Sequence, residues 1–215
     1  ELALMKSVGI NLIRVHYPLT PNLLSLYDEY GFMMMEEVPL NWWGNNMEQS
    51  LEILKQAKPV LTKMIKRDKN HPCVIIWSMS NECVTDSEVG IAVMRDLLIQ
   101  AKSLDPTRLV TFVTNGDPVK QLAFDKADII CINKYYGTLQ GNICKHILDI
   151  EEFGYKPFVN NVTRHRKELP GKPMMVSEFG AQGIKNIQGD VYYSEEFQSS
   201  YIERIWDGIN SVPGL

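Results

Sequence analysis

The sequence predicts an α/β fold in which a parallel β-sheet is covered by helices. Short apolar runs alternate with longer amphipathic segments along the 215 residues, and this regular alternation is typical of a parallel sheet. The apolar runs are rich in Val, Ile and Met, as expected for strands that are buried on both faces. These observations leave two architectures open, a closed barrel and a doubly wound sheet.

Six strands and five long helices follow from the pattern. The strands are expected at Gly9–Val15, Phe32–Val38, Val74–Met79, Leu109–Val113, Asp128–Ile132 and Met174–Ser177. The helices are expected at Asn22–Tyr30, Met47–Asp68, Glu88–Ser103, Ile150–Glu168 and Glu195–Asn210, with a weaker helical pattern at Val119–Phe124. Gly31 is placed to end one helix as a left-handed residue, and Asp105-Pro106 to stop another.

A single domain over residues 1–215 is expected, because the chain has neither internal repeats nor a low-complexity linker. A dinucleotide-binding fold gains no support, since Arg14-Val15-His16-Tyr17-Pro18 follows the first strand in place of a glycine-rich phosphate loop. The sequence opens at Glu1 inside a helical pattern, which predicts a piece of a longer protein. Its localisation, cytoplasmic or exported, stays open.

The amino-acid composition limits which partners and cofactors this protein is expected to bind. The net charge is −4, from 22 basic and 26 acidic residues without a long run of one sign, so we expect neither nucleic acid nor an anionic membrane as a partner. The longest apolar runs are too short to span a bilayer. The four cysteines lack CxxC spacing and are expected to be buried, inert thiols. No set of His, Cys and carboxylates has metal-ligand spacing, so neither a metal nor another cofactor is expected.

Polar residues collect where the predicted strands end, which is where a βα barrel carries its catalytic groups. Glu82 follows the third strand and Glu178 ends the sixth. Glycoside hydrolysis needs such a pair, one carboxyl group that donates a proton and one carboxylate that attacks the anomeric carbon. Glu36 and Glu37 end the second strand. One of them is expected to point into the barrel mouth behind the reacting groups, and the other to be a surface or ion-pair carboxylate.

Two further strand-end residues are suited to support a nucleophile. A positive charge beside a carboxylate favours its ionised form, and we expect Arg14 to take this position beside Glu178. Tyr135 is expected to donate a hydrogen bond to the same carboxylate. Trp42 and Trp43 follow the second strand, where they either stack on a sugar face or pack as loop residues against the rim.

Four segments carry a resemblance to a known family. The stretch Asn70–Glu82, which reads NHPCVIIWSMSNE, resembles the acid/base signature of glycoside hydrolase family 2. The stretch Lys172–Gly180, KPMMVSEFG, is similar to the family's nucleophile strand. His16-Tyr17-Pro18 and the stretch Asn133–Gly137, NKYYG, also match in the family's order. The resemblance covers essentially the whole chain.

The resemblance implies a (β/α)8 TIM barrel that is incomplete here, with strands two to seven present and the first and eighth missing. It also implies net retention through a covalent glycosyl-enzyme intermediate. Glu82 would act as general acid and then base, and Glu178 as nucleophile. Asn81 would bind the sugar 2-hydroxyl, and Tyr135 would steady the nucleophile.

Arg14, His16 and Asn133 complete the set of supporting residues that the family motifs imply. The family usually places two residues between this arginine and histidine, whereas here only Val15 intervenes. The substrate would be a carbohydrate or glycoconjugate, and homo-oligomers are common among family members.

The motifs favour the β-glucuronidase branch, through Tyr193–Gln198 and Asn133–Gly137. The magnesium ligands of the large β-galactosidases of the family are missing from the segment Pro39–Trp43. A β-galactosidase or β-mannosidase of the same family and a non-catalytic carbohydrate-binding barrel are the alternatives.

Several residues are expected to be structural. His71 is expected to cap the helix before it, and His146 and His165 to be solvated. Trp77 is expected in the core, as is Trp206, whose helix carries Ile202, Ile205 and Ile209 at helical spacing.

Overall fold

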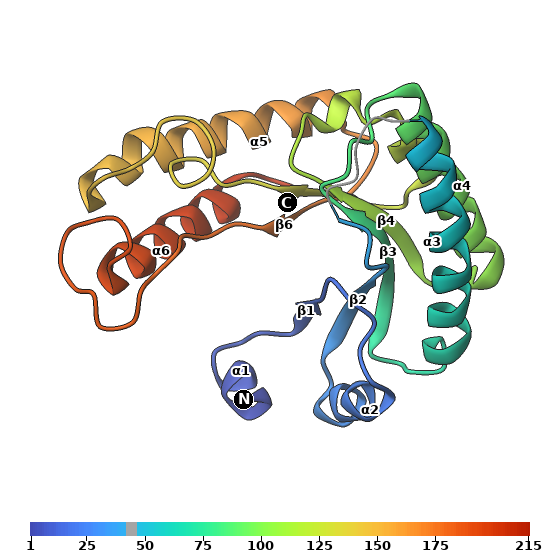
Figure 1. The fold of residues 1–215 in the computed structure, drawn as a ribbon. Coiled ribbons are helices and arrows are strands. Elements are labelled where there is room, and N and C mark those ends of the chain that lie inside the picture. The colour runs from blue at the N-terminus through green and yellow to red at the C-terminus, as the bar shows by residue number, and fades with distance from the viewer. Residues whose placement is uncertain (42–46) are drawn as a thin grey trace. The chain divides into compact units, whose positions relative to one another are not determined.

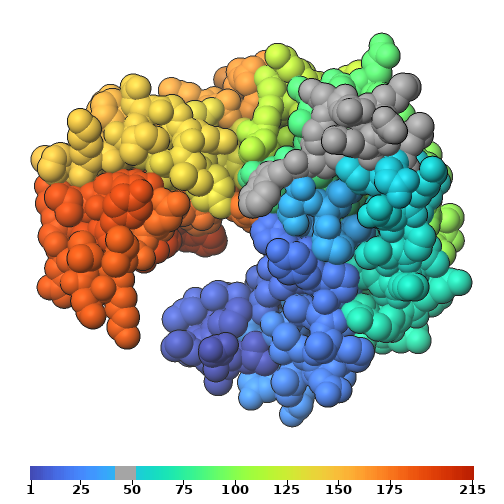
Figure 2. Space-filling view, viewed as in Figure 1, coloured from blue at the N-terminus to red at the C-terminus, as the bar shows by residue number. Residues whose placement is uncertain are grey.

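The structure is a computed structural model that describes residues 1–41 and 47–215. Trp42 and Trp43 therefore lie outside the described residues. The chain divides into two compact units, Glu1–Ile130 and Cys131–Leu215. In Figures 1 and 2 the first unit runs from blue to green and the second from yellow-green to red. Each unit is described by itself.

The N-terminal unit is a four-stranded parallel sheet with helices between its strands (Figure 1). Its elements are α1 (Leu2–Ser7), β1 (Leu12–Arg14), α2 (Pro21–Tyr30), β2 (Met33–Glu37), α3 (Met47–Asp68), β3 (Val74–Asn81), α4 (Glu88–Leu104) and β4 (Leu109–Thr114). The strands pair in chain order, β1 with β2, β2 with β3 and β3 with β4. Parallel neighbours bring their carboxyl ends to one edge of the sheet.

Local sequence explains where these elements end. Gly31 adopts a left-handed conformation with φ +67° after α2, which confirms the expected helix end. Asp105 follows α4 in an extended conformation, as its position before a proline favours. Its buried carboxylate accepts a hydrogen bond from the indole of Trp77 at 3.0 Å, so Trp77 lies in the core as expected.

The C-terminal unit carries two neighbouring strands and a pair of packed helices (Figure 1). Its elements are β5 (Ile130–Asn133, whose first residue closes the other unit), a 3-10 helix η3 (Ile147–Asp149), a π-helical turn η4 (Ile150–Tyr155), α5 (Lys156–Glu168), β6 (Met174–Glu178) and α6 (Glu195–Ser211). Strand β6 lies beside the end of β5, because the Lys134 amide donates to the Glu178 carbonyl at 2.9 Å. The face of α6 that carries Phe197, Tyr201 and Ile205 is buried.

Each predicted strand is present, and the predicted helices differ in two places. The helix expected over Ile150–Glu168 starts as the π-helical turn and becomes α-helical near Pro157, which has no amide hydrogen to donate. The weak pattern at Val119–Phe124 forms two 3-10 helices, η1 (Pro118–Lys120) and η2 (Leu122–Lys126). All four cysteines are buried, as expected.

Two expectations about single residues are wrong. Trp206 is 55% exposed, because α6 has two apolar stripes and packs through the one that holds Phe197 and Tyr201. His165 is fully buried instead of solvated, since it lies on the packed face of α5. His71 follows α3, and its amide donates to the carbonyl of Asp68, the last residue of that helix, at 2.9 Å, so the expected cap is present. Its Nδ1 lies 2.6 Å from the Asp28 carboxylate at the end of α2.

His146 is exposed, as expected. Among the described residues, no helix is both long and apolar enough to cross a membrane.

Candidate active site

Five polar residues meet at the carboxyl ends of β1, β2 and β3, and we call them the strand-end cluster: Arg14, His16, Glu37, Ser78 and Asn81. The Arg14 guanidinium donates to both Glu37 oxygens, from Nη2 at 3.0 and 3.2 Å and from Nε at 3.3 Å. The same Nη2 donates to Asn81 Oδ1 at 2.9 Å. Glu37 also accepts from the Ser78 hydroxyl at 2.7 Å and lies 3.1 Å from His16 Nδ1.

The backbone register builds this cluster. Glu37 pairs with Ser78 in the β2–β3 ladder, so both side chains project from the same face of neighbouring strands. The Val15 amide donates to the Met35 carbonyl at 3.2 Å, which holds the segment between Arg14 and His16 against β2. The ladder between β3 and β4 is irregular between Ser78 and Asn81, directly before Glu82.

Burial strengthens the attraction between the charged side chains of this cluster. The Glu37 side chain is fully buried and that of Arg14 is 9% exposed, so the two charges attract each other in a medium of low dielectric constant. His16 is 39% exposed. Since a carboxylate only accepts hydrogen bonds, the contact of His16 Nδ1 with Glu37 is a hydrogen bond in the tautomer that carries the proton on Nδ1.

Glu82 follows β3 in a strained conformation. Its φ is +51°, in the left-handed region that side chains other than glycine rarely adopt. The Glu82 amide donates to the Val113 carbonyl at 2.9 Å, and Asn115 Nδ2 donates to the Glu82 carboxylate at 3.2 Å. Such strain persists where surrounding contacts impose it, and it concentrates at functional sites. The side chain is half-buried.

Glu178 ends β6 in the C-terminal unit, with its side chain half-buried. The Tyr135 hydroxyl donates to Glu178 Oε2 at 2.7 Å, a length typical of a charge-assisted hydrogen bond. Below this pair, the Ser177 hydroxyl donates to Asn133 Oδ1 at 2.8 Å, and Asn133 is fully buried. Asn133 therefore binds β5 to β6, which fixes the strand end that carries Glu178.

Two cavities open beside this strand end in the C-terminal unit. The first, of about 290 Å³, is lined by Tyr135, Thr138, Leu139, Phe179, Gly180, Ala181 and Gln182. The second, of about 540 Å³, shares Thr138, Leu139 and Gln182 with it and adds Tyr192 and Tyr193. Apolar and aromatic walls of this kind suit a small organic ligand.

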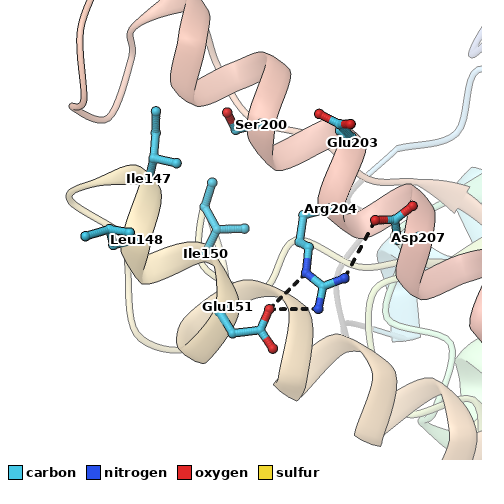
Figure 3. A pocket seen from close by; sticks show the side chains of 8 residues that line it. All are labelled: Ile147, Leu148, Ile150, Glu151, Ser200, Glu203, Arg204 and Asp207. Atoms are coloured by element: carbon cyan, nitrogen blue, oxygen red, sulfur yellow. Dashed lines mark hydrogen bonds and ion pairs between the residues drawn. The ribbon is translucent and has the colours of Figure 1, made fainter.

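A third hollow in the C-terminal unit lies away from these residues (Figure 3). It has a volume of about 300 Å³, with Ile147, Leu148 and Ile150 on one side and residues of α6 on the other. Arg204 donates to Glu151 across it at 2.8 and 2.9 Å. None of the residues that the sequence predicted for catalysis lines this groove.

Glu36 lies on the other side of β2 from the strand-end cluster and is fully buried, so it is not a surface carboxylate. Its Oε1 accepts from the Leu19 amide at 3.0 Å and lies 3.9 Å from Arg67, which pairs with Asp68 at 2.7 Å. Burial, followed by the negative charge of Asp68, raises the pKa of Glu36 to about 8. Glu37 is the glutamate that lies behind the candidate site.

The structure thus places the predicted residues in two groups. Arg14, His16 and Asn81 come together in the N-terminal unit, while Tyr135 and Asn133 lie against β6 in the C-terminal unit. The expected contact of Arg14 with Glu178 joins the two units and stays a prediction. Sequence reasoning missed Glu37 and Ser78 as partners of Arg14. The signal that could have found Glu37 is the Glu36-Glu37 pair at the end of an apolar strand.

Known proteins of one family are similar to nearly the whole of this chain. The family described as "Glycosyl hydrolases family 2, TIM barrel domain" matches residues 1–212. A β-glucuronidase of Mus musculus is 33% identical over 212 residues, which cover 94% of this chain and 31% of that protein.

Two solved structures have the same fold. A β-glucuronidase from Ruminococcus gnavus, in complex with uronic isofagomine, superposes with a TM-score of 0.88 at 28% identity, covering 98% of this chain and 38% of that one. A GH2 β-galacturonidase from Eisenbergiella tayi, bound to galacturonate, superposes with a TM-score of 0.85 at 25% identity, covering 99% and 37%.

The chain spans 31–38% of the length of the relatives named above. The expected barrel class is confirmed by the family match, and the six described strands alternate with helices as that fold requires. Because the match extends over nearly the entire sequence, this chain belongs to glycosyl hydrolases family 2 and carries that family's TIM barrel domain.

Proposed function

We propose that the protein containing this chain is a retaining β-glycosidase that hydrolyses β-D-glucuronides. The observation that carries the proposal is the hydrogen bond between Tyr135 and Glu178 at the end of a barrel strand, in a chain whose relatives include β-glucuronidases. Glu178 is the nucleophile and Glu82 the general acid and base. Their roles require the two carboxyl groups to lie about 5–5.5 Å apart across the bound sugar.

In the first step, a Glu178 oxygen forms a bond to the anomeric carbon while the bond from that carbon to the leaving oxygen breaks. Glu82 gives its proton to the leaving oxygen. In the second step, Glu82 removes a proton from water, the water oxygen bonds to the anomeric carbon, and the Glu178 carboxylate is released. Two inversions give net retention.

The hydrogen bond from Tyr135 supports the nucleophile in two ways. It fixes the rotation of the Glu178 carboxylate, so that one oxygen accepts from the phenol and the other is presented to the sugar. It also favours the ionised carboxylate, because a donor stabilises the charged form. Asn133 contributes by holding the β5 and β6 ends together through Ser177.

Asn81 binds the sugar through its amide in this proposal. Arginine has no acceptor atom, so the Asn81 oxygen faces Arg14 and the amide nitrogen faces the other way. A nitrogen donor in that position suits the 2-hydroxyl of the sugar. His16 contacts Glu37 through Nδ1, so its Nε2 is directed away from that carboxylate.

The glucuronide assignment rests on the relatives, and one solved relative favours a second candidate. The β-galacturonidase of Eisenbergiella tayi was solved with galacturonate, which differs from glucuronate only in the orientation of one hydroxyl group. Both sugars are uronic acids. A uronide is therefore the common proposal, and the configuration at that hydroxyl separates the two candidates.

The test is an assay of the full-length protein on 4-nitrophenyl β-D-glucuronide, β-D-galacturonide, β-D-galactoside and β-D-mannoside. We expect turnover of the glucuronide, lost in Glu178→Ala and in Glu82→Ala. Turnover of the neutral sugars alone would overturn the uronide assignment. Wild-type turnover in Glu178→Ala would overturn the mechanism.

A further inference from the structure

Glu37 is surrounded by several hydrogen-bond donors, although it takes no part in the two chemical steps. Its two oxygens accept from Arg14 Nε, Arg14 Nη2 and the Ser78 hydroxyl, and Oε1 also lies 3.1 Å from His16 Nδ1. The side chain is fully buried. A buried carboxylate with this many donors is held in one position, because each rotation would break several hydrogen bonds.

The contacts of Arg14 continue from Glu37 to Asn81. One guanidinium nitrogen, Nη2, donates both to Glu37 Oε2 at 3.0 Å and to Asn81 Oδ1 at 2.9 Å. The position of Arg14 is therefore set on one side by a buried charge, and this position in turn sets the rotation of the Asn81 amide. Asn81 is itself 3% exposed, so its amide has little room to turn without Arg14 moving.

We propose that Glu37 is a positioning residue, which acts through Arg14 to fix the orientation in which Asn81 donates to the sugar 2-hydroxyl. The inference rests on the proposed function, since it assigns the ligand of Asn81 from that reaction. Glu37 has no contact with the reacting atoms in this account. Its effect reaches the substrate through Arg14 and then Asn81.

The substitution Glu37→Gln tests this with a side chain of the same shape. One acceptor oxygen becomes an NH₂ group, which then faces donors on Arg14, Ser78 or His16, and the full negative charge opposite Arg14 is lost. The guanidinium then shifts, and the Asn81 amide loses its fixed orientation. A misplacement of about 1 Å costs on the order of 10²-fold in rate, and we expect a loss of that order in kcat/KM.

A substrate that lacks the 2-hydroxyl separates positioning from a general structural role. On the 2-deoxy analogue of 4-nitrophenyl β-D-glucuronide, Asn81 has no hydroxyl to bind. Most of the loss caused by Glu37→Gln is then expected to disappear when wild type and variant are compared on this analogue. In Asn81→Ala, adding Glu37→Gln is expected to cause little further loss on the normal substrate, because the two residues act as one unit.

The neighbouring glutamate provides the matched control. Glu36 is also fully buried on β2, but it contacts Leu19 and Arg67 on the other side of the strand. Its raised pKa means that the neutral carboxyl group is favoured near neutral pH, and glutamine imitates that form. We expect Glu36→Gln to keep the wild-type kcat/KM on both substrates.

The outcomes are distinguishable. A loss confined to the substrate with a 2-hydroxyl, in a variant that still unfolds well above the assay temperature, supports the inference. An equal loss on both substrates, or wild-type activity of Glu37→Gln, overturns it and leaves the proposed function standing. A wild-type protein that hydrolyses no uronide overturns the proposed function, and this inference with it.

Discussion

Glu37 in the N-terminal unit and Glu178 in the C-terminal unit both end a parallel strand, yet their surroundings differ. Glu37 is fully buried, and its two oxygens accept from an arginine and a serine. Glu178 is half-buried and accepts from the phenol of Tyr135 at 2.7 Å. The same side chain at the same kind of position is enclosed by donors in one unit and partly open to solvent in the other.

The difference separates two uses of a carboxylate. An enclosed carboxylate orders its neighbours, and its removal leaves a buried positive charge without compensation. A half-buried carboxylate keeps an oxygen within reach of a substrate, and its removal leaves less desolvated charge behind. Changes at Glu178 should therefore act on activity, and changes at Glu37 on both stability and activity.

The largest expected effect is that of Glu178→Gln on turnover. We expect kcat on the glucuronide to fall by roughly 10⁴ or more, the order of loss seen when a nucleophile is removed. The free energy of unfolding should change by less than about 1 kcal/mol, because the side chain is half-buried. Steady-state kinetics and chemical denaturation of the same preparation measure both. A variant that loses stability instead of activity would remove the contrast with Glu37.

The next effect is that of Glu37→Ala on stability. Truncation leaves Arg14, which is 9% exposed, without its charge partner, and losing one side of a buried pair costs about 3–5 kcal/mol. Chemical denaturation should show a lower midpoint with an unchanged slope. Glu37→Gln is the internal control, because it is expected to lower the free energy of unfolding by less than Glu37→Ala does. Equal stability of Glu37→Ala and wild type would mean that the strand-end cluster is not shielded from solvent.

A smaller effect is expected for Tyr135→Phe, which removes the hydroxyl that donates to Glu178. A hydrogen bond to a charged group contributes about 1.5–3 kcal/mol, equivalent to roughly a tenfold to hundredfold loss in kcat. KM should change less, because the phenol touches the nucleophile in this account. A change confined to KM would assign Tyr135 to substrate binding.

The glutamates of the candidate site also show how much of that site could be predicted from the sequence. The strand ends, and with them Glu82 and Glu178, follow from the alternation of apolar runs and from the resemblance to a family. The contacts of Arg14 with Glu37 and Asn81 do not, because they depend on the β1–β2–β3 register and on which face of β2 each glutamate occupies. A pair of adjacent glutamates gives no sign of which one faces the site.

Helix faces limit sequence reasoning for a similar reason. Helix α6 carries Phe197, Tyr201 and Ile205 on one stripe and Ile202 and Trp206 on another, and only the first is buried. Both stripes have helical spacing, so periodicity alone could not choose between them. The burial of His165 does not follow from the sequence, because its neighbours in the sequence are polar. In the structure it lies on the packed face of α5 together with Phe158 and Val162.

A pH dependence of stability is also expected, and it belongs to Glu36. Burial and the Asp68 charge raise its pKa from about 4.5 to about 8 in the folded state. The folded protein therefore holds a proton that the unfolded chain has lost between these values, and stability falls as the pH rises from about 4.5 to about 8. The slope is at most about 1.4 kcal/mol per pH unit.

Denaturation curves at pH 5, 6, 7 and 8 measure this slope, with Glu36→Gln as the control. The variant should show a flatter profile over the same range, because its side chain does not titrate. An identical profile for wild type and Glu36→Gln would assign the pH dependence to another group.

The identity of the nucleophile is tested most directly by trapping it. A 2-deoxy-2-fluoro-β-D-glucuronosyl fluoride keeps a good leaving group but slows the breakdown of a covalent glycosyl-enzyme intermediate, and digestion with mass spectrometry then locates the labelled residue. The account predicts one adduct per active site, on the peptide that contains Glu178, and none in Glu178→Ala. An adduct on Glu82 or on any other residue would contradict it.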